Sequence, residues 1–232
     1  MGQWREGFMF FRKKRKEEIS FYDSNSIKEK RAYLNGKLEG EYLSYYENGQ
    51  ILAKLNFCNG LREGEATTYY KDGQIREKGI FKNDRLVGEY VCYYEDGSIR
   101  EKENYNGNGE LDGKYILYYK SGQIKNEENF KDGKFDGEYR SYYKDGQLKE
   151  RGSFKRDIRD GYYVAYYRNG NKKEEATYKD GELDGQFICY TQDGRVVKKR
   201  DKVFPYDNEE EWDDKEQMYD DLLRKLSDFD EE

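Results

Sequence analysis

The sequence contains no histidine, one proline and three widely separated cysteines among its 232 residues. The absence of histidine excludes zinc sites that contain imidazole ligands, and Cys58, Cys92 and Cys189 form no CxxC pair or other metal-binding cluster. We therefore expect no metal centre and no cofactor. Reduced cysteines without a disulfide framework predict an intracellular, cytoplasmic protein.

Long apolar runs are also missing, since no stretch approaches the roughly 20 residues that span a bilayer. The segment "GFMFF" is too short for a secretion signal, and the basic residues follow it instead of preceding it. A content of 34% hydrophobic and 40% charged residues would by itself suggest disorder. Twenty-five tyrosines and twelve phenylalanines favour a folded chain whose elements are buried on one side.

Tyrosine pairs recur at a fixed interval, beginning at residues 45, 69, 93, 118, 142 and 166. The period is 24 residues, with one insertion at "NGNGELDG". A degenerate unit at Phe21-Tyr22 precedes the series, and half a unit follows from Tyr190 to about Phe204. Periods of this size predict stacked supersecondary units. Cys92 and Cys189 then occupy the same position of two units four repeats apart, too distant for a disulfide.

Each unit has two turn signals, one after the tyrosine pair and one in segments such as "NGKLEG". Asn-Gly and Asp-Gly favour the positive φ angles of tight hairpin turns. The intervening runs, such as "EYLSYYE", have strand length and are rich in tyrosine. We therefore predict an all-β fold, an elongated single-layer antiparallel β-meander solenoid of about seven hairpin repeats. With about 14 to 16 strands, the sheet would be on the order of 65 to 75 Å long.

The register of each hairpin depends on the length of its turn. A two-residue turn would place these pairs opposite one another on one face: Tyr46 and Ile51, Ser44 and Ala53, Tyr42 and Leu55. A three-residue turn with a bulge would shift the register. We expect the second tyrosine of each pair to be structural and the first to face outward from the other side of the sheet. The outward tyrosines, our first candidate binding set, are Tyr45, Tyr69, Tyr93, Tyr118, Tyr142 and Tyr166.

A row of glutamates interrupts the apolar face and forms the second candidate set. Its members are Glu29, Glu77, Glu101, Glu150 and Glu174. The residues expected opposite them are small, namely Ser20, Thr68, Cys92, Ser141 and Ala165. These carboxylates either accept hydrogen bonds from neighbouring tyrosine hydroxyls or form an acidic groove for a basic partner.

Units such as "YYKSGQIKNEENFKDGKFDGEYRS" resemble the MORN repeat variant of bacterial proteins, found in the YwqK-like antitoxin family of toxin-antitoxin systems. The resemblance covers roughly residues 20 to 204. It implies a single-layer elongated sheet, an intracellular interaction role and no catalytic residue. Asp84 and Asp157 replace the turn glycine of the pattern, and Arg62 and Ala66 replace an apolar and an aromatic residue. These departures predict weaker individual hairpins.

The two ends of the chain differ in composition from the array. We divide the chain into a degenerate N-terminal capping segment (1–20), the repeat array (21–204) and an acidic C-terminal helical tail (205–232). The basic run Arg12, Lys13, Lys14, Arg15 and Lys16 is either a membrane or nucleic-acid anchor or part of a first strand. The tail holds thirteen acidic and three basic residues, whereas residues 1–204 carry a net charge of +4.

An apolar stripe in the tail predicts a helix. Its members are Trp212, Tyr219, Leu222, Leu223, Leu226 and Phe229, and Asn208 with Glu211 fits a capping box. The helix would either cover the last hairpin or bind a partner.

No catalytic constellation accompanies the repeats, because histidine, a phosphate-binding glycine loop and an activated cysteine are all missing. The sequence therefore favours a non-enzymatic scaffold for protein-protein binding, in the form of an antitoxin or immunity-type protein whose partner, a toxin, has a basic surface. The alternative is a peripheral phospholipid-binding protein that uses the basic run. An acidic pI of 5.2 argues against nucleic-acid binding. The oligomeric state stays open.

Overall fold

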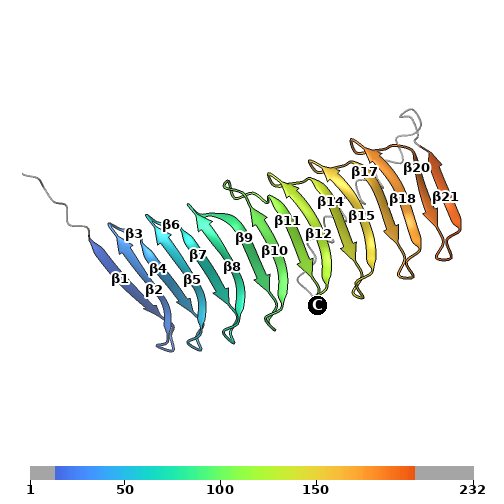
Figure 1. Cartoon of the computed structure of the whole chain (residues 1–232). Coiled ribbons are helices and arrows are strands. Elements are labelled where there is room, and N and C mark those ends of the chain that lie inside the picture. Colours follow the sequence, from blue (N-terminus) through green and yellow to red (C-terminus); the bar gives the residue numbers. More distant parts are fainter. Residues whose placement is uncertain (1–13, 202–232) are drawn as a thin grey trace, which may run out of the picture.

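The computed structural model describes residues 14–201, and they form one long antiparallel sheet with no helix among them. Figure 1 shows the hairpins side by side from β1 at the blue end to β21 at the orange end, in chain order. Every pairing joins neighbouring antiparallel strands, and the sheet stays open because β1 and β21 pair on one side only. The predicted all-β meander is confirmed, and the predicted C-terminal helix lies outside the described residues.

Each repeat contributes one hairpin. The first strands are β1 (Arg15–Phe21), β4 (Gly40–Tyr45), β7 (Gly64–Tyr69), β9 (Arg85–Tyr93), β11 (Gly113–Tyr118), β14 (Gly137–Tyr142), β17 (Gly161–Tyr166) and β20 (Gln186–Tyr190). The second strands are β2 (Ile27–Leu34), β5 (Ile51–Cys58), β8 (Ile75–Lys82), β10 (Ile99–Tyr105), β12 (Ile124–Lys131), β15 (Leu148–Lys155), β18 (Lys172–Lys179) and β21 (Val196–Asp201). These sixteen strands agree with the expected number.

Five two-residue strands extend the pairing beside the turns that join one repeat to the next. They are β3 (Lys37–Leu38), β6 (Leu61–Arg62), β13 (Lys134–Phe135), β16 (Ile158–Arg159) and β19 (Glu182–Leu183).

The turn after each tyrosine pair has three residues and a bulge. In the first full repeat the amide of Gly49 donates to the carbonyl of Tyr46 (2.9 Å), and Gly49 has a φ of 86°. Tyr45, and not Tyr46, therefore pairs with Ile51, so the predicted Tyr46–Ile51 pair is wrong. A register shift then leaves Leu52 unpaired and restores the predicted pairs Ser44–Ala53 and Tyr42–Leu55. The Asn-Gly signal is ambiguous because it suits both turn lengths.

The turns between repeats are two-residue turns in which both residues have positive φ, as at Asn59 (53°) and Gly60 (89°). Asp84 and Asp157 adopt the same conformation with φ of 66° and 69°. Their carboxylates accept hydrogen bonds from the backbone amides of Arg62 and Phe135 in the preceding repeat, each at 2.8 Å. Each aspartate thus adds an inter-repeat bond that the sequence pattern does not predict.

The second tyrosine of each pair binds the next repeat along the opposite edge of the sheet. The hydroxyl donates to a backbone carbonyl at 2.7 to 2.8 Å in the first seven hairpins. The donors are Tyr22, Tyr46, Tyr70, Tyr94, Tyr119, Tyr143 and Tyr167, and the acceptors are the carbonyls of Tyr45, Tyr69, Tyr93, Tyr118, Tyr142, Tyr166 and Tyr190. The structural role expected for this stripe is confirmed by these bonds.

Successive residues of a strand point to opposite sides, so the sheet has two faces. We call face A the side that carries Tyr42, Ser44 and Ala53, and face B the side that carries Leu43, Tyr45 and Lys54. On face A the aromatic rings pack against one another across repeats, as in Phe130–Phe135 (centroids 4.3 Å apart) and Phe135–Phe154 (5.5 Å). These rings cover small residues in place of a second layer.

The packing of aromatic rings over small residues on face A is very close at Gly152. A Cβ atom at this position would lie 2.7 Å from the ring of Tyr139, which is directly opposite in β14. Gly79 has the same position in an earlier repeat, where a Cβ atom would lie 2.8 Å from Tyr90. Face A is therefore closed by aromatic side chains that lie flat over their neighbours.

Candidate interaction surface

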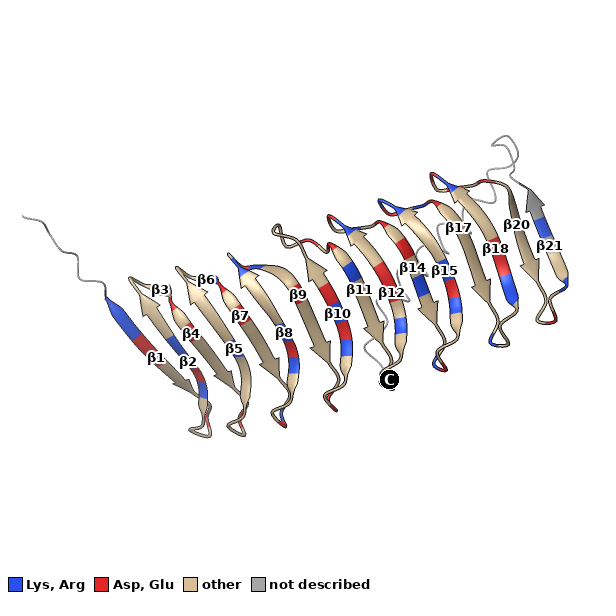
Figure 2. Cartoon of the chain, in the orientation of Figure 1, with Lys and Arg blue, Asp and Glu red and all other residues tan. Residues whose placement is uncertain are grey.

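A continuous row of directly paired residues crosses the middle of face B, and we call it the belt. On first strands its members are Ile19, Leu43, Thr67, Val91, Ile116, Arg140, Val164 and Ile188. On second strands they are Lys30, Lys54, Lys78, Lys102, Glu127, Arg151, Glu175 and Lys199. Figure 2 shows that the second strands carry most of the charge within the sheet.

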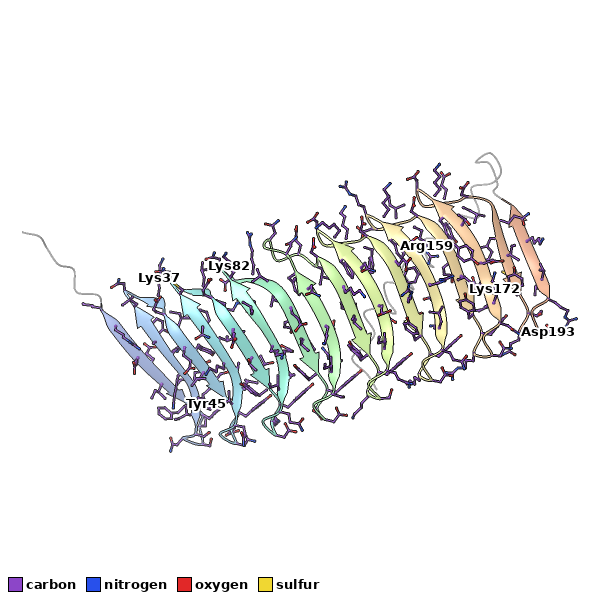
Figure 3. The ribbon with its side chains drawn as sticks, in the orientation of Figure 1. Lys37, Tyr45, Lys82, Arg159, Lys172 and Asp193 are labelled. Atoms are coloured by element: carbon purple, nitrogen blue, oxygen red, sulfur yellow. The ribbon has the colours of Figure 1, made fainter. Side chains whose placement is uncertain are left out.

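The outward tyrosines lie on face B beside the belt, and each is half-buried. Lysines of the belt approach two of their rings, with the Nζ of Lys30 5.5 Å from the ring centre of Tyr45 and that of Lys78 5.8 Å from Tyr93. Figure 3 labels Tyr45 near the turn end of the first full repeat. These rings pack against lysine side chains and stay accessible from the solvent side.

Face B also carries the exposed apolar side chains of the sheet. By strand alternation Ile19 (52% exposed), Phe21 (56%), Ile80 (46%) and Tyr162 (42%) all lie on this face. Among the described residues the exception is Val197 (64% exposed), at the bulge position of the terminal strand β21, which turns its side chain to face A. Apolar surface is therefore offered to solvent mainly from face B.

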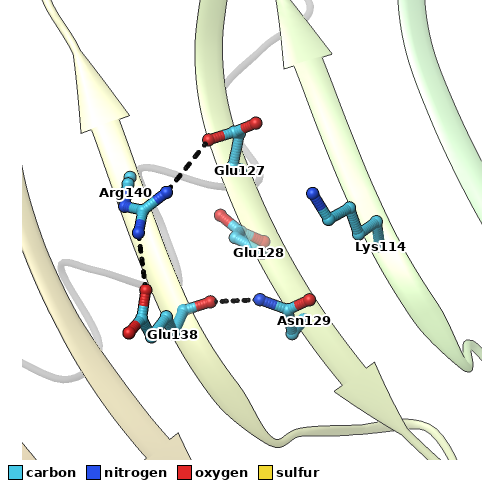
Figure 4. A pocket seen from close by; sticks show the side chains of 6 residues that line it. All are labelled: Lys114, Glu127, Glu128, Asn129, Glu138 and Arg140. Atoms are coloured by element: carbon cyan, nitrogen blue, oxygen red, sulfur yellow. Dashed lines mark hydrogen bonds and ion pairs between the residues drawn. The ribbon is translucent and has the colours of Figure 1, made fainter.

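The belt changes character after β11. Glu127 takes the lysine position, where its carboxylate accepts a hydrogen bond from the hydroxyl of Tyr142 (3.1 Å) and lies 3.9 Å from Arg140. Arg140 also binds Glu138 at 2.6 Å, as Figure 4 shows. With Lys114 and Asn129 these side chains line a hollow of about 230 Å³.

Glu175 forms a second closed cluster in the same half of the belt. It pairs with Lys172 at 2.6 Å and accepts hydrogen bonds from the hydroxyls of Tyr162 and Tyr190. The bond from Lys172 lowers the pKa of Glu175 to about 2. Both glutamates in this half of the belt are therefore paired within the sheet.

The predicted glutamate row lies on face A, opposite the predicted small residues. The two candidate sets consequently occupy opposite faces, as the alternation required. The carboxylate of Glu77 accepts from the hydroxyl of Thr68 (3.3 Å), and that of Glu150 accepts from Ser141 (3.2 Å) and Tyr163 (3.4 Å). Aliphatic hydroxyls of serine and threonine and the phenolic hydroxyl of tyrosine thus all donate hydrogen bonds to the glutamate row.

Basic side chains neutralise much of this row. Arg76 and Glu77 are consecutive, yet their side chains form an ion pair at 3.2 Å because the bulge turns both to face A. Similar pairs join Arg100 to Glu101 (3.5 Å) and Lys173 to Glu174 (3.5 Å), and Glu29 binds Arg31 (3.3 Å). The row is a mixed-charge network and not an uncompensated acidic groove.

Two further glutamates, Glu103 and Glu128, lie at the centre of face A and belong to neither predicted set. Burial raises the pKa of Glu128 to about 7, with only 9% of the residue exposed. Burial and the neighbouring Glu101 also raise the pKa of Glu103, which accepts a hydrogen bond from the hydroxyl of Tyr105. Both occupy the position held by Gly79 and Gly152 in other repeats. A glutamate at a repeat position that holds glycine elsewhere is therefore the sequence signal by which these two residues could have been predicted.

The basic run is only partly described. Arg15 and Lys16 belong to β1 and pair with Glu17 and Glu18, with the Arg15 and Lys16 side chains 73% and 69% exposed. Arg12 and Lys13 lie outside the described residues. Within residues 14–201 no group of acidic residues or cysteines has a metal-binding arrangement.

Comparison with known proteins agrees with this geometry. The family model described as "MORN repeat variant" matches six segments, residues 38–59, 62–83, 86–106, 111–132, 135–156 and 159–180. A search of curated proteins returned no match. Each matched segment ends at or near a turn between repeats, and together the segments cover more than half of the chain. The chain belongs to the MORN repeat variant family, a family of repeat scaffolds that bind proteins or membranes.

Proposed function

We propose that this protein is a non-enzymatic scaffold that binds another protein through face B. The observation that carries the proposal is the concentration of exposed apolar side chains on face B, with Ile19, Phe21, Ile80 and Tyr162 all on the face of the outward tyrosines. Exposed apolar patches beside tyrosine and charged groups are typical of protein interaction surfaces. On face A the corresponding rings and hydroxyls contact the protein itself.

The rows of face B recur with every repeat, so the surface is long and narrow. Tyrosine supplies contact area there at a low cost in side-chain entropy. The glutamate row gives weaker support for the expected basic partner. Cations on face A already lie beside its carboxylates, so a partner's basic groups would have to compete with them.

Capture experiments in the native host test which face binds. The bait is the tagged full chain, compared with a face B variant (Tyr69→Thr with Tyr118→Thr) and a matched variant of the structural stripe (Tyr70→Phe with Tyr119→Phe). We expect a partner that is retained by the wild type and the stripe variant and lost by the face B variant. Equal retention by all three baits would contradict the proposal.

The antitoxin role is the finer form of this proposal, and it rests on the resemblance of the repeats to the YwqK-like family. Its test is to express the captured partner alone and together with this chain. A toxin would arrest growth when expressed alone, and the wild type but not the face B variant would restore it. A partner that is harmless alone would contradict the antitoxin role and leave the scaffold function intact. We also propose a cytoplasmic location and no catalytic activity.

A second candidate function is membrane binding, favoured by the exposed basic side chains of Arg15 and Lys16 at the start of β1. The described residues contain no helix long and apolar enough to cross a membrane. Sedimentation with phosphatidylserine vesicles tests surface binding, and substituting Arg12, Lys13, Lys14, Arg15 and Lys16 by Gln would abolish it if the run is the anchor.

A further inference from the structure

We propose that the N-terminal half of the belt binds an acidic α-helical segment of the partner protein, an inference that rests on the proposed function. Four lysines occupy one register in this half, and they are Lys30, Lys54, Lys78 and Lys102. They alternate, strand by strand, with Ile19, Leu43, Thr67, Val91 and Ile116. The surface is therefore one row of lysine side chains in which mostly apolar side chains lie between successive lysines.

The cations retain capacity for an external carboxylate. Lys54 binds Glu41 at 2.8 Å, but its side chain is still 49% exposed. Lys30 and Lys78 lie over tyrosine rings, an arrangement that occupies one side of an ammonium group and leaves donors on the other. Within residues 14–201 no carboxylate forms an ion pair with Lys30, Lys78 or Lys102. The C-terminal half differs, since its glutamates are already paired.

The spacing of the lysines matches a helix. Successive lysines are two strands apart, which is about 9.6 Å, and seven residues of an α-helix rise about 10.5 Å. An acidic residue at every seventh position would meet successive lysines, and an apolar residue three or four positions later would meet Leu43, Thr67 or Val91. From Lys30 to Lys102 the row is six strand spacings long, about 29 Å, which a helix of about 19 residues covers.

Two other occupants fit less well. A flat anionic membrane would also face Glu41, Glu65 and Glu89, which lie on face B beside the lysines, whereas a helix can follow the lysine row alone. The acidic tail of the same chain follows Asp201 in the sequence, and Asp201 lies fourteen strand spacings or about 67 Å from Lys30. A helix made of all 31 residues that follow Asp201 would extend only about 47 Å, which does not reach Lys30.

Binding of a synthetic peptide to the full chain tests the inference. The probe is a fluorescein-labelled 22-residue helix with Glu at positions 1, 8, 15 and 22 and Leu between them, and its control carries Lys in place of Glu. The belt variant is Lys30→Gln, Lys78→Gln and Lys102→Gln. The matched variant is Lys28→Gln, Lys149→Gln and Lys173→Gln, three exposed lysines at the bulge position with the same change in charge.

We expect the Glu peptide to bind and to weaken with added salt, and the belt variant to lose about tenfold in affinity. The Lys peptide should not bind, and the matched variant should behave as the wild type. Equal losses in both variants, or vesicles that bind through the belt while the peptide does not, would overturn the inference. If the captured partner needs the face B tyrosines but binds the belt variant as tightly as the wild type, the inference is overturned and the proposed function stands. Thermal melts of each variant verify that it is folded.

Discussion

The two faces of this sheet are made of alternate residues of the same strands, yet they use their side chains differently. On face A, hydroxyls, carboxylates and guanidinium groups bind one another, and rings such as Tyr139 and Phe154 stack at 5.3 Å. On face B the exposed apolar residues gather, and four lysines have no second layer above them. A single-layer sheet can therefore keep one side for its own stability and leave the other for a ligand.

The difference follows from the period of the side chains. Because neighbouring residues point to opposite faces, consecutive positions can evolve under separate constraints, as in Tyr162 and Tyr163. The ring of Tyr163 lies 4.9 Å from the guanidinium of Arg159, and its hydroxyl donates to Glu150. Tyr162 is 42% exposed on face B. Substitutions at such pairs separate stability from binding.

The largest effect should come from truncating a ring on face A. We expect Tyr163→Ala to lower the free energy of unfolding by about 3 to 5 kcal/mol, because the ring's contacts with Arg159 and its neighbours are lost. Tyr162→Ala should cost about 1 kcal/mol or less. Urea denaturation of both variants gives the comparison. Equal losses at the two positions would show that both faces are packed alike.

A smaller effect concerns the pH dependence of stability. Glu128 has a folded-state pKa of about 7, above its usual value, so the folded state binds a proton that the unfolded state has released. Its stabilisation is complete below about pH 4.5 and is lost as the pH rises through 7, by about 2 to 3 kcal/mol. We expect Glu128→Gln to melt with the wild type at pH 4.5 and above it at pH 8.

Glu175 on face B provides the control of opposite sign. Its folded-state pKa is about 2, so it stabilises the sheet above about pH 4.5, and that contribution disappears as the pH falls through 2. Glu175→Gln should therefore melt below the wild type at pH 7, with a difference that shrinks in acid. A parallel response of the two variants would remove this distinction between the faces.

The smallest effect is expected at the stripe of hydroxyls. Tyr119→Phe removes one hydrogen bond to the carbonyl of Tyr142 (2.7 Å) and should cost about 1 kcal/mol. Tyr118→Phe, on face B, should change stability by about 0.5 kcal/mol or less. Chemical denaturation measures both. If the two substitutions cost the same, the inter-repeat hydroxyl bond contributes nothing measurable.

The sequence by itself determined the repeat, its strands and the division into two faces. Periodicity was sufficient because the 24-residue interval, the turn glycines and the alternation along a strand are all local properties of the chain. The same alternation predicted that Tyr45 and Glu77 would lie on opposite faces, and the pairing confirms it. The family resemblance of the repeats is likewise carried by short motifs.

The tertiary structure decided what lies between repeats. Whether Asn48-Gly49 closes a two- or three-residue turn depends on hydrogen bonds across the hairpin, and the bulge that results turns Arg76 toward Glu77. The lysines of the belt recur every 24 residues in the sequence, but they become neighbours of Leu43 and Val91 only when the hairpins stack. Burial of Glu128 has the same origin, since the pKa of a carboxyl depends on the groups packed around it and not on its place in the sequence.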